Sequence, residues 1–265
     1  MVHNSPEVEA AIKYIKANLH EEITLQQVAK HVAYSPYHFS RIFKDQIGLP
    51  PHYYLSALRL QRAKELLIHT DLTIRDIGME IGQHSLGTFT TRFTQKVGVS
   101  PSVFRQSESS VTQHLQQIQL KRTKAFNRYR NISQTVRGKI TSPSEINGII
   151  LLGLFSKPIP EGLPLYGTIL ETEGEFAFEN VKAGTYYLLS TTVNTGMNSS
   201  EILLTESTLR AKLEEPVIVQ PHHETPQLNV TLRPPRIDDP PVLISIAVLM
   251  QQYISSNIGI GEGNI

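Results

Sequence analysis

The chain is organised around residues 35–48, which read SPYHFSRIFKDQIG and have the marks of a short amphipathic helix. Ser35 suits an N-cap, Pro36 suits the first helical position, and Gly48 suits a left-handed stop. The apolar residues follow the three-and-four spacing of a buried stripe: Phe39, Ile42, Phe43 and Ile47. The polar, basic and aromatic residues share another face: Tyr37, Ser40, Arg41 and Lys44.

This second face allows two interpretations. On DNA, arginine offers a bidentate fork to guanine, serine hydrogen bonds to bases, and lysine and tyrosine suit phosphates and sugars. A solvated surface helix often carries the same kind of face. The preceding residues favour the first interpretation, because residues 24–27 form a Thr-x-x-Gln capping box and only Ala33 and Tyr34 separate that short helix from Ser35. Two helices and a tight turn predict a helix-turn-helix.

The pattern occurs twice in the chain. Residues 72–77, LTIRDI, repeat residues 23–28, ITLQQV, at an offset of 49. After one extra residue in the turn the offset becomes 50, and these residues match in order: Ser85, Phe89, Phe93, Gly98 and Pro101 with Ser35, Phe39, Phe43, Gly48 and Pro51. A long helix from Pro51 to about residue 69 joins the copies, and another helix is expected over about residues 6–20. Two such units on one rod would reach adjacent major grooves, which recur about every 34 Å along B-DNA.

Charge is divided unevenly along the 265 residues, a length sufficient for two domains with separate cores. Residues 1–134 hold 17 Lys and Arg against 10 Asp and Glu, a net charge of +7, whereas residues 135–265 hold 8 against 14, a net charge of −6. Only the first part has the sign of a polyanion binder. The absence of cysteine excludes disulfides and thiolate chemistry. The longest apolar run, residues 242–250, is too short for a membrane span, so we expect a cytoplasmic protein without membrane contact.

Residues 7–106 closely resemble the paired helix-turn-helix domain of the AraC/XylS family of bacterial transcription regulators. Four segments carry the resemblance: YSPYHFSRIFK at 34–44, ALRLQRAKELL at 57–67, FTTRF at 89–93 and VGVSP at 97–101. The resemblance implies transcription regulation through double-stranded DNA, with base-facing positions on the second helix of each unit. With the caps and the basic face, the candidate DNA-binding residues are Ser35, Tyr37, His38, Ser40, Arg41, Lys44, Ser85, Gly87, Thr88, Thr90 and Thr91.

The second unit departs from the family pattern. The family commonly places arginine directly after the position that matches Ser40, but this chain has Thr91 there and Arg92 one residue later. Threonine offers a methyl group to thymine or a hydroxyl group to phosphate, which carries less sequence information than an arginine fork on guanine. We therefore expect the first half-site to be the more stringent one. The domain also leads the chain, as it does in a minority of the family.

Residues 107–134 are Ser- and Gln-rich and then basic, which predicts a linker or connecting helix. Its basic end, residues 121–130, is either an extra phosphate-binding arm or a solvated charge run. Beyond it the hydrophobic period changes to two, and strands are expected at 136–141, 149–155, 165–171, 175–178, 185–193, 217–220 and 228–232. These predict an antiparallel sandwich over residues 135–254. Residues 242–250 suit a final strand or a helix, and residues 255–265 a flexible tail.

Turn glycines and aromatic residues at 138–140, 162–164, 174–181 and 183–188 resemble the carboxypeptidase regulatory-like, transthyretin-type sandwich. They describe a scaffold and imply no function.

Three groups of residues in this half carry side chains that could form a metal site, a catalytic pair or a ligand pocket. His222, His223 and Glu224 suggest a metal, but adjacent residues on an extended chain point to opposite faces. An acidic set at strand spacing suggests a solvated face or a catalytic pair: Glu171, Glu173, Glu175 and Glu179. Four aromatic residues suggest a filled core or a ligand pocket: Phe176, Phe178, Tyr186 and Tyr187. No nucleophile elbow or phosphate loop is present, so no catalytic residue, cofactor or metal is predicted.

The predicted fold class is multidomain, with an all-α double helix-turn-helix domain at residues 1–106 followed by an all-β antiparallel sandwich domain. The leading hypothesis is a sequence-specific transcription regulator whose sandwich senses an unknown small-molecule effector or contacts a protein partner such as RNA polymerase. The alternative is a DNA-tethered protein-interaction module with no small-molecule effector. A fused enzyme would require turnover by residues 135–265. The opposite charges also allow the sandwich to contact the DNA-binding domain in cis.

Overall fold

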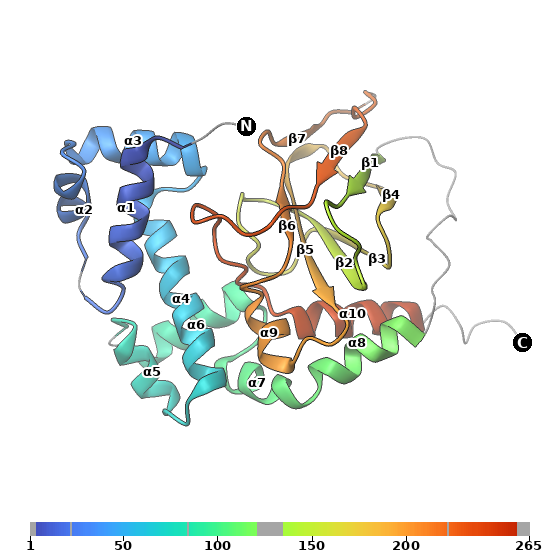
Figure 1. Ribbon diagram of the computed structural model, residues 1–265, viewed down its shortest axis with the longest axis horizontal. Helices are drawn as coiled ribbons and strands as arrows, with labels where there is room; N and C mark the ends of the chain where they lie inside the picture. The colour runs from blue at the N-terminus through green and yellow to red at the C-terminus, as the bar shows by residue number, and fades with distance from the viewer. Residues whose placement is uncertain (1–3, 22, 84, 121–134, 222, 259–265) are drawn as a thin grey trace, which may run out of the picture.

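The fold was established from a computed structural model, which describes residues 4–21, 23–83, 85–120, 135–221 and 223–258. The first part is helical: α1 Pro6–Ala17, α2 Leu25–His31, α3 Pro36–Ile47, α4 Pro51–His69, α5 Ile74–Glu80, α6 Leu86–Val97 and α7 Pro101–Gln106. Figure 1 shows α1–α3 at one end of α4 and α5–α7 at the other. The two predicted helix-turn-helix units on one rod are confirmed, although α1 ends at Ala17, earlier than expected.

We call α3 and α6 the recognition helices, since each is the second helix of its unit. Both begin and end as the sequence predicts. The side chains of Ser35 and Ser85 accept hydrogen bonds from backbone amides in the first turn of α3 and α6. Gly48 and Gly98 stop them in the left-handed region, with φ of 83° and 93°. The two copies therefore share one local design, which explains the sequence repeat.

The turn inside each unit also needs a left-handed residue, and here the copies differ. Gly82 fills this position in the second unit with φ of 72°, whereas Ala33 fills it in the first with φ of 57°. A Cβ atom strains this conformation, so the first unit carries a cost that the second avoids.

The second part contains two sheets, as predicted. The smaller has the order β4–β1–β8, built from Gly174–Phe178, Val136–Thr141 and Leu228–Thr231. The larger has the order β3–β2–β5–β6, built from Tyr166–Leu170, Gly148–Phe155, Gly184–Asn194 and Arg210–Lys212, and β7 (Val217–Val219) pairs with β5. One pairing corrects the antiparallel prediction, because β1 and β8 run parallel. The strand β6 was not predicted, since three residues give too little periodicity.

Helices also pack within this part, so it is not purely β. A 3-10 turn at Ser107–Ser109 leads into α8 (Val111–Leu120), which contacts both α9 (Ser199–Leu204) and α10 (Ile246–Ile258). Residues 107–134, expected to be a linker or a connecting helix, therefore begin with a packed helix, while their basic end lies outside the described residues. The run 242–250 supplies the start of α10, which continues four residues into the expected tail. None of the described helices is long and apolar enough to cross a membrane.

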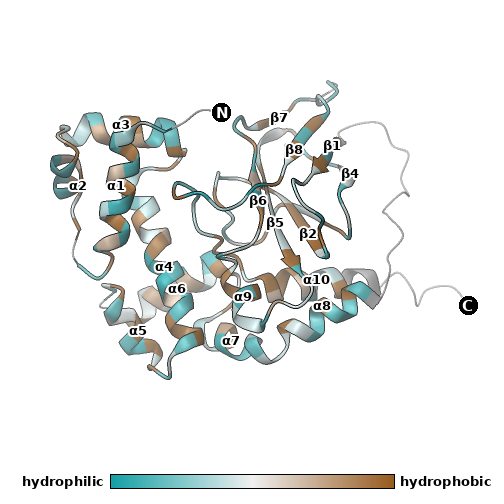
Figure 2. Ribbon diagram, viewed as in Figure 1, coloured by the Kyte–Doolittle hydropathy of each residue, from teal (hydrophilic) through white to brown (hydrophobic). Residues whose placement is uncertain are grey.

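The strand β2 explains how the two parts join. Its residues are buried on both faces, so the alternation of a half-buried strand is absent. Ile150 and Leu152 point into the core between the sheets, whereas Ile149 and Leu151 belong to a second cluster that continues into the helical units. Figure 2 shows the hydrophobic β2 inside the β-rich part. The β-rich part thus has one core of its own between the sheets, and a second apolar cluster, from Val8 to Ile254, is shared with the helical units.

Lys64 lies within this shared core. Its side chain is fully buried, and its Nζ atom donates a hydrogen bond of 2.7 Å to the carbonyl oxygen of Val242. The same Nζ lies 5.5 Å from the centre of the Phe104 ring. Burial lowers the pKa of Lys64 to about 7, against a weaker opposing effect of Glu65 and Glu206. The amine of Lys64 thus ties α4 to the segment that leads into α10.

We expect Ala33→Gly to stabilise the chain by about 0.5–1 kcal/mol, because glycine relieves the left-handed strain. Gly82→Ala is the matched reverse change and should destabilise it by about 1 kcal/mol. Chemical denaturation of both variants measures these free energies. Equal shifts of the same sign would contradict the assignment of strain to this turn.

Lys64 should make the free energy of unfolding depend on pH. Between pH 7 and about 10 the unfolded state holds the Lys64 proton and the folded state releases it, so stability rises with pH across this window. The difference in unfolding free energy between the natural chain and Lys64→Met should therefore move in favour of the natural chain from pH 7 to 9. The exposed Lys44→Met serves as control and should show a constant difference. A constant difference for Lys64→Met as well would contradict the lowered pKa.

Candidate nucleic-acid interface

The candidate residues of α3 lie mainly on its open side. Tyr37 is 82% exposed, Arg41 and Lys44 are exposed, and Ser40 is half-buried. His38 is half-buried and stands edge-on to Tyr34 in the preceding turn. Phe39, Phe43 and Ile47 fill the opposite side of the helix, as the spacing predicts. This arrangement presents an aromatic ring, a guanidinium group and an ammonium group on one solvent-facing surface.

The matching surface of α6 is open but uncharged at these positions. Gly87, Thr88 and Thr91 are exposed, and Thr90 is half-buried. A Cβ atom added at Gly87 would meet nothing within 4 Å. This face offers close backbone approach, hydroxyl groups and methyl groups.

Arg92 lies at the edge of the α6 face. Its Nη1 atom donates a hydrogen bond of 3.2 Å to Oε1 of Gln83, in the turn between α5 and α6. The side chain thus has a partner within its own unit, at a position displaced by one residue from the usual arginine.

Ser35 and Ser85 serve first as helix caps. The side-chain oxygen of Ser35 accepts from the backbone amide of His38 at 3.3 Å, and that of Ser85 accepts from Thr88 at 3.4 Å. Both residues are exposed, so their hydroxyl groups also face solvent. Such a cap gathers free amides at the helix start, where a phosphate oxygen is favoured.

The C-terminal end of α6 is held by the β-rich part. The backbone amide of Gly162 donates a hydrogen bond of 2.6 Å to the carbonyl oxygen of Lys96, and the amide of Ser245 donates one of 2.8 Å to that of Val97. The last carbonyl groups of a helix have no partner within the helix, so these donors complete its end. We call these two bonds the α6 anchor.

A polar cluster surrounds the α6 anchor. Lys96 donates hydrogen bonds of 2.7 Å to both carboxylate oxygens of Glu161, and Lys157 donates one of 3.1 Å. Tyr53, at the start of α4, donates to Glu161 and accepts from Lys96. Burial acts to raise the pKa of Glu161, but hydrogen bonds from Lys96 and Tyr53 outweigh it and hold the pKa below its ordinary value. Glu161 is therefore a charged link between α4, α6 and the loop after β2.

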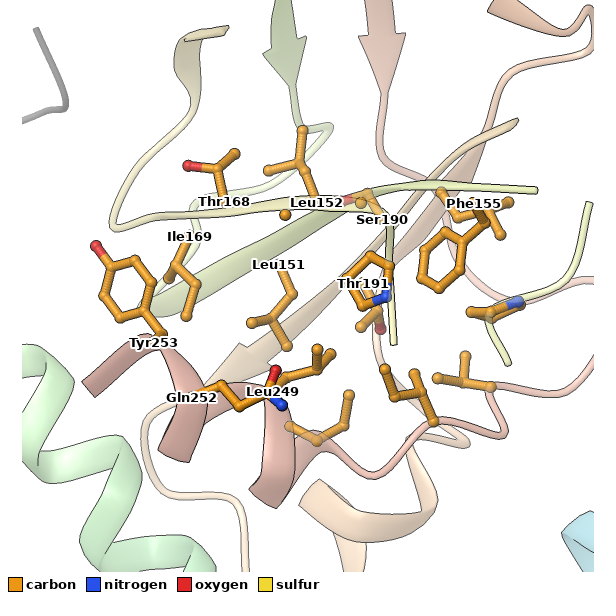
Figure 3. A pocket seen from close by; sticks show the side chains of 18 residues that line it. Leu151, Leu152, Phe155, Thr168, Ile169, Ser190, Thr191, Leu249, Gln252 and Tyr253 are labelled. Carbon is orange, nitrogen blue, oxygen red and sulfur yellow. The ribbon is translucent and has the colours of Figure 1, made fainter. Parts of the chain in front are cut away.

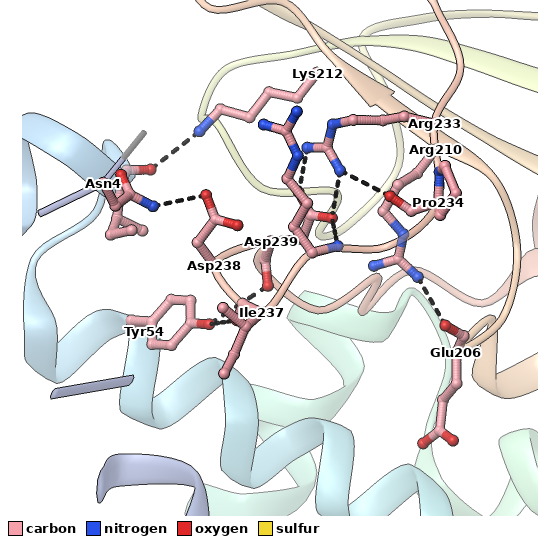
Figure 4. A network of polar contacts seen from close by, with 12 residues as sticks. Asn4, Tyr54, Glu206, Arg210, Lys212, Arg233, Pro234, Ile237, Asp238 and Asp239 are labelled. Atoms are coloured by element: carbon pink, nitrogen blue, oxygen red, sulfur yellow. Dashed lines mark hydrogen bonds and ion pairs between the residues drawn. The ribbon is translucent and has the colours of Figure 1, made fainter. Parts of the chain in front are cut away.

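A second network joins the first unit to the β-rich part (Figure 4). Lys212 on β6 donates a hydrogen bond of 3.0 Å to the carbonyl oxygen of Ile47, near the C-terminal end of α3. Asp238 accepts from Asn4 at 2.7 Å. The loop that carries Asp238 is fixed by Arg233, which binds both carboxylate oxygens of Asp239 at 2.8 and 2.6 Å. Both recognition helices are thus held at their C-terminal ends by the same part of the chain.

The candidate DNA-binding residues lie apart from these contacts. Among the described residues, no hydrogen bond or ion pair joins the β-rich part to residues 35–44 or 85–91. The anchoring residues were missed at the sequence level, because Glu161, Lys212 and Ser245 follow no local motif. The opposite charges of the two parts were the available signal, and they indicate contact without naming the residues.

The aromatic, acidic and histidine groups of the β-rich part are the remaining candidates from the sequence. Phe176, Phe178 and Tyr186 are buried between the sheets, which confirms the core interpretation for them. Glu171 and Glu175 are exposed, and Glu173 accepts a hydrogen bond of 2.8 Å from the amide of Ser142. His222 lies outside the described residues. Within the described part, no group of three potential metal ligands occurs.

Comparison with known proteins identifies the helical part. A family model described as a helix-turn-helix domain matches residues 28–107. Regulatory protein PocR of Salmonella typhimurium is 36% identical over 104 residues, which are 39% of this chain and 34% of PocR. The lactose operon transcription activator of Staphylococcus xylosus is 33% identical over 99 residues, 37% of this chain and 36% of the activator. The chain thus spans about a third of the length of each relative.

A solved structure from Chromobacterium violaceum is described as a transcriptional regulator with an AraC-type DNA-binding domain. It is 29% identical, with a TM-score of 0.38, and the match covers 38% of this chain and 91% of that one. Residues 28–107 therefore match a helix-turn-helix family model, and about two fifths of the chain is similar to part of known regulators of transcription.

Proposed function

We propose that the chain is a sequence-specific transcription regulator that reads two successive major grooves with α3 and α6. The observation that carries this proposal is the pair of recognition helices, capped alike and joined by the single helix α4, with their polar faces open. The 19 residues of α4 span roughly 28 Å at the usual helical rise. That length is comparable to the ~34 Å between grooves on one face of DNA.

The two half-sites are proposed to differ in stringency. On α3, Arg41 supplies the fork for a guanine, while Lys44 and Tyr37 suit phosphates and sugars. On α6, Thr88 and Thr91 supply weaker contacts, and Ser35 and Ser85 mark the helix starts that receive phosphates. His38, Ser40, Gly87 and Thr90 complete the proposed surface. The hydrogen bond of Arg92 to Gln83 supports the view that this arginine does not take over the role of Arg41.

The β-rich part is proposed to set the relative placement of the two helices. Its contacts reach the C-terminal ends of α3 and α6 and leave the proposed DNA-facing residues open. An effector or a protein partner that binds this part would then act through the helix ends. RNA polymerase is one protein partner that such a transcription regulator could contact through this part.

Selection of random duplexes by the full chain tests the proposal at moderate salt. We expect enrichment of two half-sites about one helical turn, or about 10 base pairs, apart. The full chain is the right material, because the helical units share a core with the β-rich part. Enrichment of no site beyond salt-dependent binding to any duplex would contradict sequence-specific regulation.

Arg41→Ala should cost about 1–3 kcal/mol of binding free energy on the selected site and relax the preference at one base pair. Lys44→Ala is the matched control on the same helix face. It should weaken selected and random duplexes alike and lower the salt dependence by about one phosphate contact. Binding isotherms on both duplexes at several salt concentrations give these values. Equal losses on both duplexes for Arg41→Ala would remove its base-reading role.

Glu161→Gln should loosen the end of α6, because it leaves Lys96 and Lys157 without their counter-charge. We expect a loss of about 1–3 kcal/mol in the free energy of unfolding, and weaker binding to a duplex with both half-sites. Binding to a duplex with only the first half-site should not change. The exposed Glu171→Gln is the control and should stay within about 0.5 kcal/mol of the natural chain. An equal loss on both duplexes would show that Glu161 does not act through the placement of α6.

A further inference from the structure

A cavity of about 300 Å³ lies between the larger sheet and α10 (Figure 3). Leu151, Ile169 and Thr191 line it from the sheet, and Leu249 lines it from α10. Gly153 and Gly167 pair across β2 and β3, and the space beside them is taken by Phe155 and Pro164, which also line the cavity. This part of the wall is therefore apolar.

The lining defines the chemistry of an occupant. None of the lining residues is charged, so an ion would lose its hydration without receiving a counter-charge. An engineered cavity of about 150 Å³ holds benzene, so this one has room for roughly 10–15 non-hydrogen atoms. The lining fits a neutral molecule with a mainly apolar body.

Thr191 adds a directional polar contact. Thr191 is 6% exposed, and its Oγ1 atom lies 2.8 Å from Oγ1 of Thr208. The Thr208 hydroxyl has the carbonyl of Thr205 as an acceptor at 3.0 Å, and the Thr191 hydroxyl has the carbonyl of Leu209 as an acceptor at 3.4 Å. A hydroxyl group has one proton and two lone pairs, so these contacts do not use up the Thr191 oxygen. The Thr191 oxygen therefore keeps a lone pair for an incoming donor. A hydroxyl or N–H group on the occupant satisfies it.

Two walls of the cavity also form the α6 anchor. Pro160 and Pro164 line the cavity, and Gly162 between them donates to the end of α6. Ile244 and Ile246 line it from the other segment, and Ser245 between them makes the second bond of the anchor. The two segments are joined, because the carbonyl of Pro160 accepts from the amides of Leu243 and Ile244 at 3.0 Å. A molecule in the cavity therefore contacts the segments that hold α6.

We propose that this cavity binds a small, neutral, mainly apolar molecule with one hydroxyl or N–H donor, and that its binding tightens the α6 anchor. The regulatory part of this proposal rests on the proposed function, whereas the binding part does not. The bound molecule fills the space behind residues 160–164 and 242–246 and restricts their motion. The second recognition helix is then held in one placement for a larger share of the time.

The experiment uses three probes on the full chain: 2-naphthol, 2-methylnaphthalene and 2-naphthoate. We expect 2-naphthol to bind about fivefold more tightly than 2-methylnaphthalene, which has the same size but no donor. The anion 2-naphthoate should bind least. Tighter binding of 2-naphthoate than of 2-naphthol would overturn the assignment of a neutral ligand.

Variants of cavity residues test whether the probes bind in this cavity. Thr191→Val should abolish the preference for 2-naphthol, while Thr192→Val, a buried threonine on the opposite face of the same strand, should keep it. Leu249→Trp should weaken both neutral probes about tenfold or more by filling the space. Retention of the preference in Thr191→Val, or unchanged binding in Leu249→Trp, would overturn this site.

Amide hydrogen exchange tests the coupling without DNA. Saturation with 2-naphthol should slow exchange at Gly162 and Ser245 severalfold in the natural chain and leave it unchanged in Leu249→Trp. Unchanged exchange in the natural chain would overturn the coupling. The affinity for a duplex with both half-sites should rise with 2-naphthol in the natural chain alone. A chain that binds 2-naphthol but selects no DNA site would refute the proposed function and leave the cavity assignment standing.

Discussion

The hydrogen bonds at the C-terminal ends of the recognition helices are the contacts on which the arrangement of the chain depends. A helix leaves its last carbonyl groups without internal partners. In this chain Gly162 and Ser245 complete the end of α6, and Lys212 reaches the end of α3. A helix that is held at one end pivots about that end, so small shifts there move its first turns. The first turns carry the residues proposed to meet DNA.

Local chemistry made the helical part predictable. A cap, a stop and an apolar stripe act within a dozen residues, and the repeat at 49 and 50 residues doubled the evidence. The polar face of α3 followed from the same stripe, because residues that avoid the buried side must lie on the open one. The candidate residues of α6 followed instead from the family resemblance. The exposure of Tyr37 and Arg41 agrees with that reasoning, although their role on DNA stays a prediction.

Long-range packing was not predictable to the same degree. A strand that is buried on both faces and a buried helix both appear as an apolar run, so β2 gave no sign that it faces two cores. The parallel pairing of β1 with β8 depends on which strands meet, which periodicity does not encode. Glu161 and Ser245 lie in ordinary loop sequence, and their importance comes only from the helix end that the fold places beside them.

The free energy of a single contact is small, and this explains why a shared core favours the control of DNA binding by the β-rich part. One hydrogen bond contributes about 0.5–1.5 kcal/mol net, and a tenfold change in affinity needs about 1.4 kcal/mol. A flexible linker would average over many placements of α6, so a change of one contact in the β-rich part would be lost. In a chain whose apolar cluster continues from Val8 to Ile254, packed side chains connect the site of such a change to the helix end. Under the proposed function, a change worth one hydrogen bond in the β-rich part would then alter DNA binding by up to about tenfold.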